Sequence, residues 1–208
     1  MPSVNFRLLL VTDRHHTLGR PLVPLLDRAI EAGVQAIQLR ERDLSTPELL
    51  SLVQDAHAVS ARRSVPLLIN DRVDLMMAMN LDGVHLRSDS LPAQSVRESI
   101  GSRRLIGVST HSAEDVQLAN RSGADYVVFG PVYDTPSKRA FGPALGLALL
   151  DEVCRRSAIP VFAIGGITCD RVQDVRRAGA YGVAVIGALL TRDDIGEAVR
   201  EFTDALQI

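Results

Sequence analysis

The 208-residue chain contains no tryptophan, only two cysteines and no apolar run long enough to span a membrane. Cys154 and Cys169 are too few for a disulfide framework or a zinc site, so we expect a reduced, cytoplasmic setting. The longest apolar stretch, residues 181–190, is about half of a membrane-spanning helix. The amino terminus lacks a basic segment followed by an apolar region and a small-residue cleavage site, so we expect no secretory signal.

A strong excess of either charge is also missing. The 23 lysines and arginines nearly balance the 25 acidic residues, and the net charge is −2. This balance leaves no electrostatic footprint for nucleic acid or for an anionic membrane surface. The length and the 46% apolar content suit one domain with a buried core, and we assign residues 1–208 to it. We therefore expect an enzyme or a small-molecule binder, without nucleic acid or membrane partners.

Short, almost wholly apolar runs alternate with longer amphipathic stretches along the chain. Runs of this kind are typical of parallel strands that are buried under covering helices. The expected strands are residues 7–12, 36–40, 66–69, 83–86, 105–109, 126–129, 161–164 and 182–186.

Local signals mark where several intervening helices begin and end. Thr46 is the expected cap of a helix that has Pro47 at its first position, and Thr168 is the expected cap of a later helix. Glycines stand where three helices are expected to end, namely Gly33, Gly123 and Gly179.

Eight strands and about eight helices leave about 26 residues for each strand–helix unit of the 208-residue chain. This spacing predicts an α/β protein built as a single-domain (β/α)8 TIM barrel, near the small end of the usual size range. An open, doubly wound sheet is the alternative, and it is disfavoured because a second binding half is not visible in the sequence.

Charged and polar residues follow several of the expected strands, at the end of the barrel where catalytic groups lie. Arg40, Arg42 and Lys138 stand on loops expected to meet there, and such cations match phosphate oxygens. Asn70 and Asp71 offer the oxygen ligands that Mg²⁺ takes together with substrate phosphates. The set predicts a diphosphate substrate.

A purely structural alternative exists for each of these residues. Arg40 or Arg42 could instead pair with Glu41 or Asp43 at the rim of the barrel. Asp71 could instead cap the helix that follows it.

Glycines follow the last two strands. Gly165 and Gly166 are expected to open a helix after the seventh strand, and Gly187 follows the eighth. Backbone N–H groups at helix starts bind phosphate, and barrels often use these two loops for that purpose. We therefore expect a second site for a monophosphate, the alternative being tight turns that merely require glycine.

Two histidines are candidate acid–base groups near neutral pH. His85 ends the fourth strand, and His111 follows Ser109 and Thr110 in a polar loop. Because a histidine at a strand end is more often hydrogen-bonded in the core, His111 is the better candidate.

Seven short motifs occur in order along the chain. They are LVTD at 10–13, QLRER at 38–42, LINDRVD at 68–74, DGVHL at 82–86, IGVS at 106–109, GPVYDTPSK at 130–138 and AIGGI at 163–167. As a set they resemble the thiamine phosphate synthase/TenI superfamily over essentially the whole chain. The resemblance implies a (β/α)8 barrel transferase of thiamine biosynthesis. It would join hydroxymethylpyrimidine diphosphate to hydroxyethylthiazole phosphate and release pyrophosphate, while Mg²⁺ and basic residues take charge from the leaving diphosphate.

The resemblance also assigns roles to residues on the pyrimidine side. Gln38 and Arg40 would hold the pyrimidine diphosphate, with Arg42 where the family commonly has lysine. Asn70 would contact the diphosphate or the pyrimidine, and Asp71 would bind Mg²⁺.

Ser109 would meet the diphosphate, while Thr135, Ser137 and Lys138 match a Thr-x-Thr-Lys motif that contacts thiazole and pyrophosphate in the family. Backbone N–H groups would hold the thiazole phosphate at Gly165, Gly166, Ile186 and Gly187. The candidate catalytic residues are Arg40, Asn70, Lys138 and His111.

Two departures from the family pattern stand out. After the histidine and leucine of the fourth strand the synthase pattern reads Gly-Gln-x-Asp, and its aspartate is a second Mg²⁺ ligand. Here Arg87 begins the loop, Ser90 occupies the ligand position and Asp89 lies one residue early, where it would substitute if the loop shifts. Gly187 stands where the family usually has serine.

The altered loop leaves two other functions open. It resembles, together with His111 and Ser112, the TenI-type thiazole tautomerases, which isomerise a carboxylated thiazole phosphate with a histidine and need no diphosphate. The second alternative function is that of a regulator, a barrel that binds thiazole or thiamine phosphate without catalysis. Barrels of this family often associate through their helices, so a homo-oligomer is part of the expectation.

Overall fold

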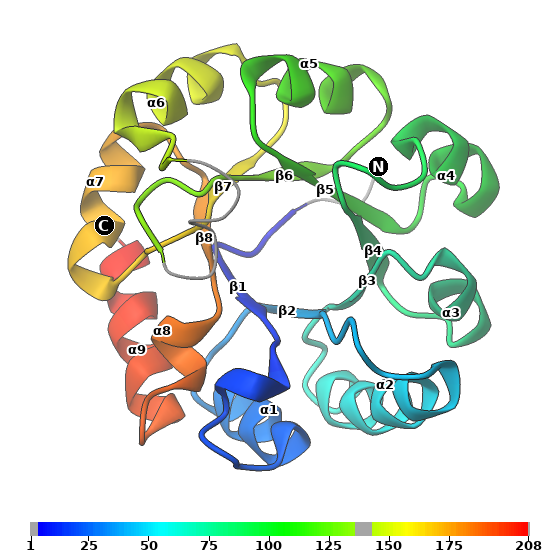
Figure 1. Ribbon diagram of the computed structural model, residues 1–208. Helices are drawn as coiled ribbons and strands as arrows, with labels where there is room; N and C mark the ends of the chain where they lie inside the picture. Colours follow the sequence, from blue (N-terminus) through cyan, green and yellow to red (C-terminus); the bar gives the residue numbers. More distant parts are fainter. Residues whose placement is uncertain (1–3, 136–142, 208) are drawn as a thin grey trace.

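The computed structural model describes residues 4–135 and 143–207, which form one closed barrel of eight parallel strands paired in sequence order (Figure 1). The strands are β1 (Leu8–Val11), β2 (Ala36–Leu39), β3 (Leu67–Asn70), β4 (Gly83–Leu86), β5 (Leu105–Thr110), β6 (Tyr126–Phe129), β7 (Val161–Ala163) and β8 (Gly182–Val185). Each end lies within one residue of the predicted end. The barrel prediction is confirmed, and the open-sheet alternative is wrong because β1 pairs with β8.

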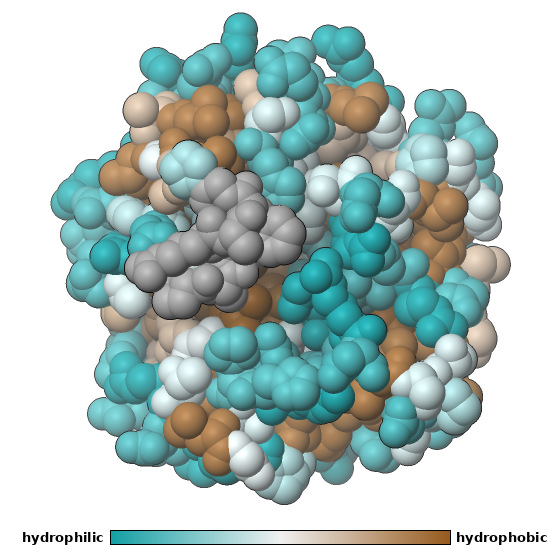
Figure 2. Space-filling model, viewed as in Figure 1, coloured by the Kyte–Doolittle hydropathy of each residue, from teal (hydrophilic) through white to brown (hydrophobic). Residues whose placement is uncertain are grey.

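Helices surround the barrel on its outside, as Figure 1 shows. They are α1 (Leu22–Glu31), α2 (Thr46–Ala61), α3 (Val73–Ala78), α4 (Ala93–Ile100), α5 (Ala113–Arg121), α6 (Gly146–Arg156), α7 (Val172–Arg177), α8 (Gly187–Leu190) and α9 (Ile195–Leu206). Within residues 4–135 and 143–207 they are joined by the 3-10 turns η1 (Arg14–His16) and η3 (Cys169–Arg171). Figure 2 shows the same face of the molecule, where hydrophilic side chains gather over the β2–β4 side of the barrel.

The start of α2 differs by one residue from the prediction. The cap is Ser45, whose backbone N–H donates to the Glu48 carboxylate at 2.8 Å, and Thr46 is already helical. The shift follows from the capping box, since Glu48 lies three residues after Ser45 and reaches back to it. The predicted helix ends are confirmed by glycines with left-handed φ angles after α1, α5 and α7, namely Gly33 (107°), Gly123 (79°) and Gly179 (86°).

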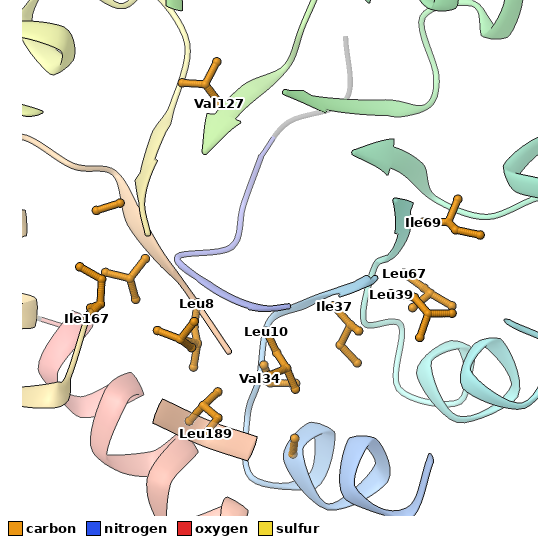
Figure 3. Close-up of a cluster of buried hydrophobic side chains, with 14 of the residues drawn as sticks. Leu8, Leu10, Val34, Ile37, Leu39, Leu67, Ile69, Val127, Ile167 and Leu189 are labelled. Carbon is orange, nitrogen blue, oxygen red and sulfur yellow. The ribbon is translucent and has the colours of Figure 1, made fainter. Parts of the chain in front are cut away.

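Both faces of the strands are buried, which explains why their sequences lack polar alternation. Leu8 and Leu10 point outward into the cluster between the barrel and its helices, whereas Leu9 and Val11 point into the barrel. Figure 3 shows the outer cluster, with Leu8 and Leu10 on the side of the helices. Inside the barrel, the aromatic rings of Phe6, Tyr126 and Phe162 pack against one another, with ring centroids 5.2–5.7 Å apart. The barrel is a packed scaffold that fixes the positions of the groups at its carboxyl end.

In the part of the chain that the structure describes, no helix combines the length and the apolar character that crossing a membrane requires.

Candidate active site

Polar side chains replace apolar ones inside the barrel near the carboxyl ends of β2–β5. Ala36 belongs to the inner cluster, so Gln38 and Arg40 follow it on the face that points to the axis. On β3 the same alternation places Asn70 two residues after the inner Leu68. The Gln38 Nε2 donates to Asn70 Oδ1 at 3.1 Å. Three residues predicted to bind the diphosphate therefore lie together.

Arg40 is a half-buried cation without a carboxylate partner. Burial lowers the pKa of its guanidinium and the neighbouring Arg42 lowers it further, against the smaller opposing effects of the Asp13 and Glu41 charges. Among the described residues no carboxylate forms an ion pair with either side chain, and Glu41 and Asp43 both pair with Arg14 instead. The alternative in which Arg40 or Arg42 pairs with these two acids is therefore wrong. A desolvated guanidinium of this kind is arranged to receive an anion.

Glu41 fixes the loop that carries Arg40. Its carboxylate is buried and accepts a 2.7 Å hydrogen bond from Thr12 Oγ1 and a 3.1 Å bond from the Arg14 backbone. Thr12 Oγ1 in turn accepts the Arg40 N–H at 2.9 Å. The loop after β1 thus positions the loop after β2, a contact that sequence reasoning missed because the partners lie 28 and 29 residues apart.

Asp71 lies just beyond β3 and is bound tightly to the end of β4. Its φ of 62° is in the left-handed region, and its N–H donates to His85 O at 2.9 Å. Asp71 Oδ1 accepts the Arg87 N–H at 3.1 Å, and Oδ2 lies 3.1 Å from Arg87 Nε. The alternative in which its side chain caps the next helix is wrong, because Arg72 is the cap residue of α3 and the carboxylate turns to Arg87.

Asp89 contacts the same nitrogen of Arg87 as Asp71 does. Its Oδ1 lies 2.9 Å from Arg87 Nε, and this hydrogen bond lowers the pKa of the Asp89 carboxyl. Because Arg87 Nε lies 3.1 Å from Asp71 Oδ2 and 2.9 Å from Asp89 Oδ1, these two oxygens are at most about 6.0 Å apart. Ser90, at the position where the family pattern has the second ligand, donates its N–H to Arg87 O at 3.3 Å in a turn.

The donor set suits Mg²⁺ in kind. Among the described residues no three histidine, cysteine or acidic side chains gather as a metal site by themselves. Mg²⁺ needs fewer, because one or two carboxylates commonly hold it together with substrate phosphates. Asp71 and Asp89 provide two such carboxylates around the single side chain of Arg87.

A pocket of about 200 Å³ opens at this rim. Its polar lining comprises Glu41, Arg42, Asn70, Asp71, Arg72 and Arg87. Figure 2 shows the hydrophilic surface on this side of the barrel. Asn70 connects the pocket with the barrel axis, where it contacts Gln38. The pocket therefore gathers three arginines and two carboxylates beside Asn70.

Buried hydrogen bonds connect Ser109 with His85 and Tyr126. His85 Nε2 lies 2.9 Å from Ser109 Oγ, and His85 Nδ1 lies 3.1 Å from the Tyr126 hydroxyl. Burial lowers the pKa of His85 to about 3, so the imidazole is neutral at pH 7. This agrees with the prediction that His85 is a hydrogen-bonded core residue, and its contact fixes the position of the Ser109 hydroxyl.

The buried His85 should make the protein less stable in acid. Below pH 6.5 the unfolded chain binds a proton that the folded chain excludes until about pH 3, so stability falls with decreasing pH. The loss from this group should be about 2 kcal/mol between pH 6.5 and pH 5. Urea unfolding of wild type and His85→Gln at several pH values measures it. His57→Gln, on α2, is the control that should keep the wild-type slope; an unchanged slope in His85→Gln would contradict the prediction.

His111 is anchored rather than free. Its Nδ1 lies 2.6 Å from the carbonyl oxygen of Gly130, and its backbone N–H donates to Asp115 at 2.9 Å. His111 thus connects the loop after β5 with the loop after β6. Thr135 follows in that second loop, whereas Ser137 and Lys138 lie outside the described residues.

The glycines after β7 allow the loop after β7 to pack closely against the loop after β6. Gly165 and Gly166 have φ angles of 96° and 63°, and a Cβ on Gly165 would lie 2.5 Å from that of Pro131. No helix starts at the pair, contrary to the prediction, because the chain first turns and η3 begins at Cys169. Gly187 does open α8 directly, and its N–H has no intrahelical acceptor.

The chain is similar to known proteins over nearly its whole length. A family model described as thiamine monophosphate synthase matches residues 8–189. A protein from Geobacter sulfurreducens named "Putative thiamine-phosphate synthase" is 44% identical over 96% of this chain and 94% of its own. The "Thiamine-phosphate synthase" of Roseiflexus castenholzii is 40% identical over 98% of this chain and 89% of its own. Among solved structures, thiamine phosphate pyrophosphorylase from Pyrococcus furiosus superposes with a TM-score of 0.88 at 31% identity, covering 97% and 96% of the two chains.

Proposed function

Because the chain belongs to the thiamine monophosphate synthase family, we propose that it joins hydroxymethylpyrimidine diphosphate to hydroxyethylthiazole phosphate, forming thiamine phosphate and pyrophosphate. The enzyme is a transferase. The observation that supports the choice of substrate is Arg40, a half-buried guanidinium that forms no ion pair with a carboxylate among the described residues and follows two residues after Gln38, which contacts Asn70. An isomerase that handles only a monophosphate has no need for this arrangement.

The reaction exchanges one bond for another without any change of oxidation state. The bond between the pyrimidine methylene carbon and the diphosphate oxygen breaks, and its electron pair leaves with the pyrophosphate. The thiazole nitrogen then donates its lone pair to the pyrimidine cation. Charge therefore accumulates on the leaving group, and preorganised donors at that point lower the barrier.

The residues at the ends of β2–β5 supply those donors. Arg40 would bind the diphosphate through its guanidinium fork, and Arg42 would add charge from the exposed rim. Gln38 and Asn70 hold each other in place and would orient the pyrimidine and the inner phosphate. Ser109, oriented by His85, would donate its hydroxyl to the same phosphates.

Asp71 and Asp89 are the residues that would hold Mg²⁺. The ion, when bound, would neutralise negative charge on the diphosphate oxygens as the carbon–oxygen bond breaks. Asp71 is the fixed member of the pair, because three contacts to the end of β4 determine where its carboxylate lies. Asp89 is largely exposed, so it can adjust its position.

The thiazole phosphate is proposed to bind on the opposite side of the barrel mouth. There the inner side chains of Ile164 and Ile186 adjoin the apolar cluster, and the first turn of α8 offers the N–H group of Gly187. Gly165 and Gly166 would contribute backbone groups from the turn after β7. Placing both substrates at one mouth holds the thiazole nitrogen in line with the methylene carbon.

Restoring a hydroxyl at position 187 should improve binding of the thiazole phosphate. A Cβ on Gly187 would meet only Thr191 Cγ2, at 3.7 Å, so Gly187→Ser should fold normally. One added hydrogen bond to the phosphate, worth about 1 kcal/mol, should lower the KM for hydroxyethylthiazole phosphate about fivefold. In the matched variant Gly165→Ser the new Cβ clashes with Pro131, so thermal unfolding should occur at a lower temperature. An unchanged KM in a folded Gly187→Ser protein would place the phosphate elsewhere.

Mixing the two thiamine precursors with the protein, with and without Mg²⁺, tests the proposal. We expect thiamine phosphate and pyrophosphate in equal amounts, with formation stopped by a chelator. Turnover of a carboxylated thiazole phosphate in the presence of chelator, lost in His111→Ala, would instead identify a tautomerase. Tight binding of thiazole phosphate without turnover of either substrate set would identify a regulator.

The proposed partners are these small phosphorylated substrates, with neither nucleic acid nor membrane among them, and the proposed location is the cytoplasm. The near-neutral charge of the chain and its two free thiols support this. Light scattering coupled to gel filtration would measure whether copies of the barrel associate.

A further inference from the structure

The side chain of Arg87 stands between the two carboxylates assigned to Mg²⁺. Its Nε lies 3.1 Å from Asp71 Oδ2 and 2.9 Å from Asp89 Oδ1. One guanidinium therefore contacts both carboxylates and offsets part of their negative charge. A divalent ion bound between the same two oxygens would occupy the position of this guanidinium, and the two cations would repel each other there.

The geometry allows the side chain to leave while the site keeps its shape. The backbone N–H of Arg87 holds Asp71 Oδ1 at 3.1 Å independently of the guanidinium. The side chains of Arg87 and Asp89 are 37% and 73% exposed, so no core packing opposes their movement. Arg87 also lines the pocket beside Arg42, where a released guanidinium would face the diphosphate.

We propose that Arg87 acts as an internal cation that holds Asp71 and Asp89 in the substrate-free protein and competes with divalent metal for them. The inference rests on the metal site of the proposed function. Where the family pattern has glycine, this chain carries its own competitor, so metal alone binds weakly. Metal that arrives with the diphosphate binds better, because the displaced guanidinium then gains an anionic partner in the pocket.

Binding of Mn²⁺ to the substrate-free protein, followed by electron paramagnetic resonance, tests this without turnover. Arg87→Ala removes the competitor and should lower the Mn²⁺ Kd about fivefold to tenfold, as expected for loss of exposed ion pairs. Arg87→Lys keeps the charge and should give an intermediate Kd. Adding Asp71→Asn to Arg87→Ala should remove the gain.

Arg72→Ala is the matched control. Arg72 lines the same pocket but pairs with Asp74, so its removal subtracts one positive charge without freeing either carboxylate. A Kd for Arg87→Ala equal to that of wild type, or an equal gain in Arg72→Ala, would overturn the proposal. Product formation from the two precursors is measured separately, so a protein that makes thiamine phosphate but shows equal Mn²⁺ affinities would disprove only this inference.

Discussion

Replacing Asp71 with asparagine should lower kcat for thiamine phosphate formation by about 10³-fold and leave the barrel folded. Asparagine tolerates the left-handed φ of 62° at this position about as well as aspartate, and its amide oxygen can still accept the Arg87 N–H. The variant therefore loses the charge but keeps the turn. A metal that offsets leaving-group charge contributes several kcal/mol, and about 4 kcal/mol corresponds to the expected factor.

The neighbouring Asp74 provides the control for Asp71→Asn. Asp74→Asn makes the same chemical change three residues further on, at an exposed carboxylate that pairs with Arg72 outside the proposed metal site. Its kcat should stay within about twofold of wild type. The measurement is initial rate against Mg²⁺ concentration for both variants. An Asp71→Asn enzyme with wild-type turnover and wild-type Mg²⁺ dependence would exclude Asp71 as a metal ligand.

Features that depend on residues close in sequence could be predicted. The strands follow from apolar runs such as Leu8–Val11, whose two faces are both buried, so the runs lack the polar alternation of an exposed sheet. Charged and polar residues that follow strands, such as Arg40 and Asp71, could be placed at the carboxyl end of the barrel, whereas Gln38 was assigned only through the resemblance to the family. The residue types there were then sufficient to indicate a diphosphate.

Contacts between distant segments could not be predicted in the same way. The bridge from Arg87 to Asp71 spans 16 residues, and the bond from His85 to Tyr126 spans 41. Periodicity places such residues on a strand or loop but does not determine which side chains satisfy one another across strands. The proposed competition of Arg87 with metal therefore depends on the parallel pairing of β3 with β4, which brings the ends of these strands side by side (Figure 1).

Replacing Arg40 with methionine should lower kcat/KM for the pyrimidine diphosphate by about 10³-fold. Methionine keeps an apolar stem of similar length at a half-buried position, so the change mainly removes the charged fork. A donor aimed at developing negative charge contributes a factor of about 10²–10³, and loss of ground-state binding adds to it. Arg40→Lys should recover part of the rate, because an ammonium restores the charge without the bidentate geometry.

The stability of Arg40→Met separates this role from a structural one. Burial and the adjacent Arg42 disfavour the charged form of Arg40, and among the described residues no carboxylate pairs with it. Its removal should therefore leave the melting temperature of the substrate-free protein at or above the wild-type value, as for residues kept for function at the expense of stability. Arg62→Met, at the carboxyl end of α2 where Arg62 pairs with Asp27, should change kcat/KM by less than about threefold. A large fall in melting temperature together with the loss of activity would show that Arg40 supports the fold. Full activity would show that the diphosphate does not bind at the inner face of the barrel.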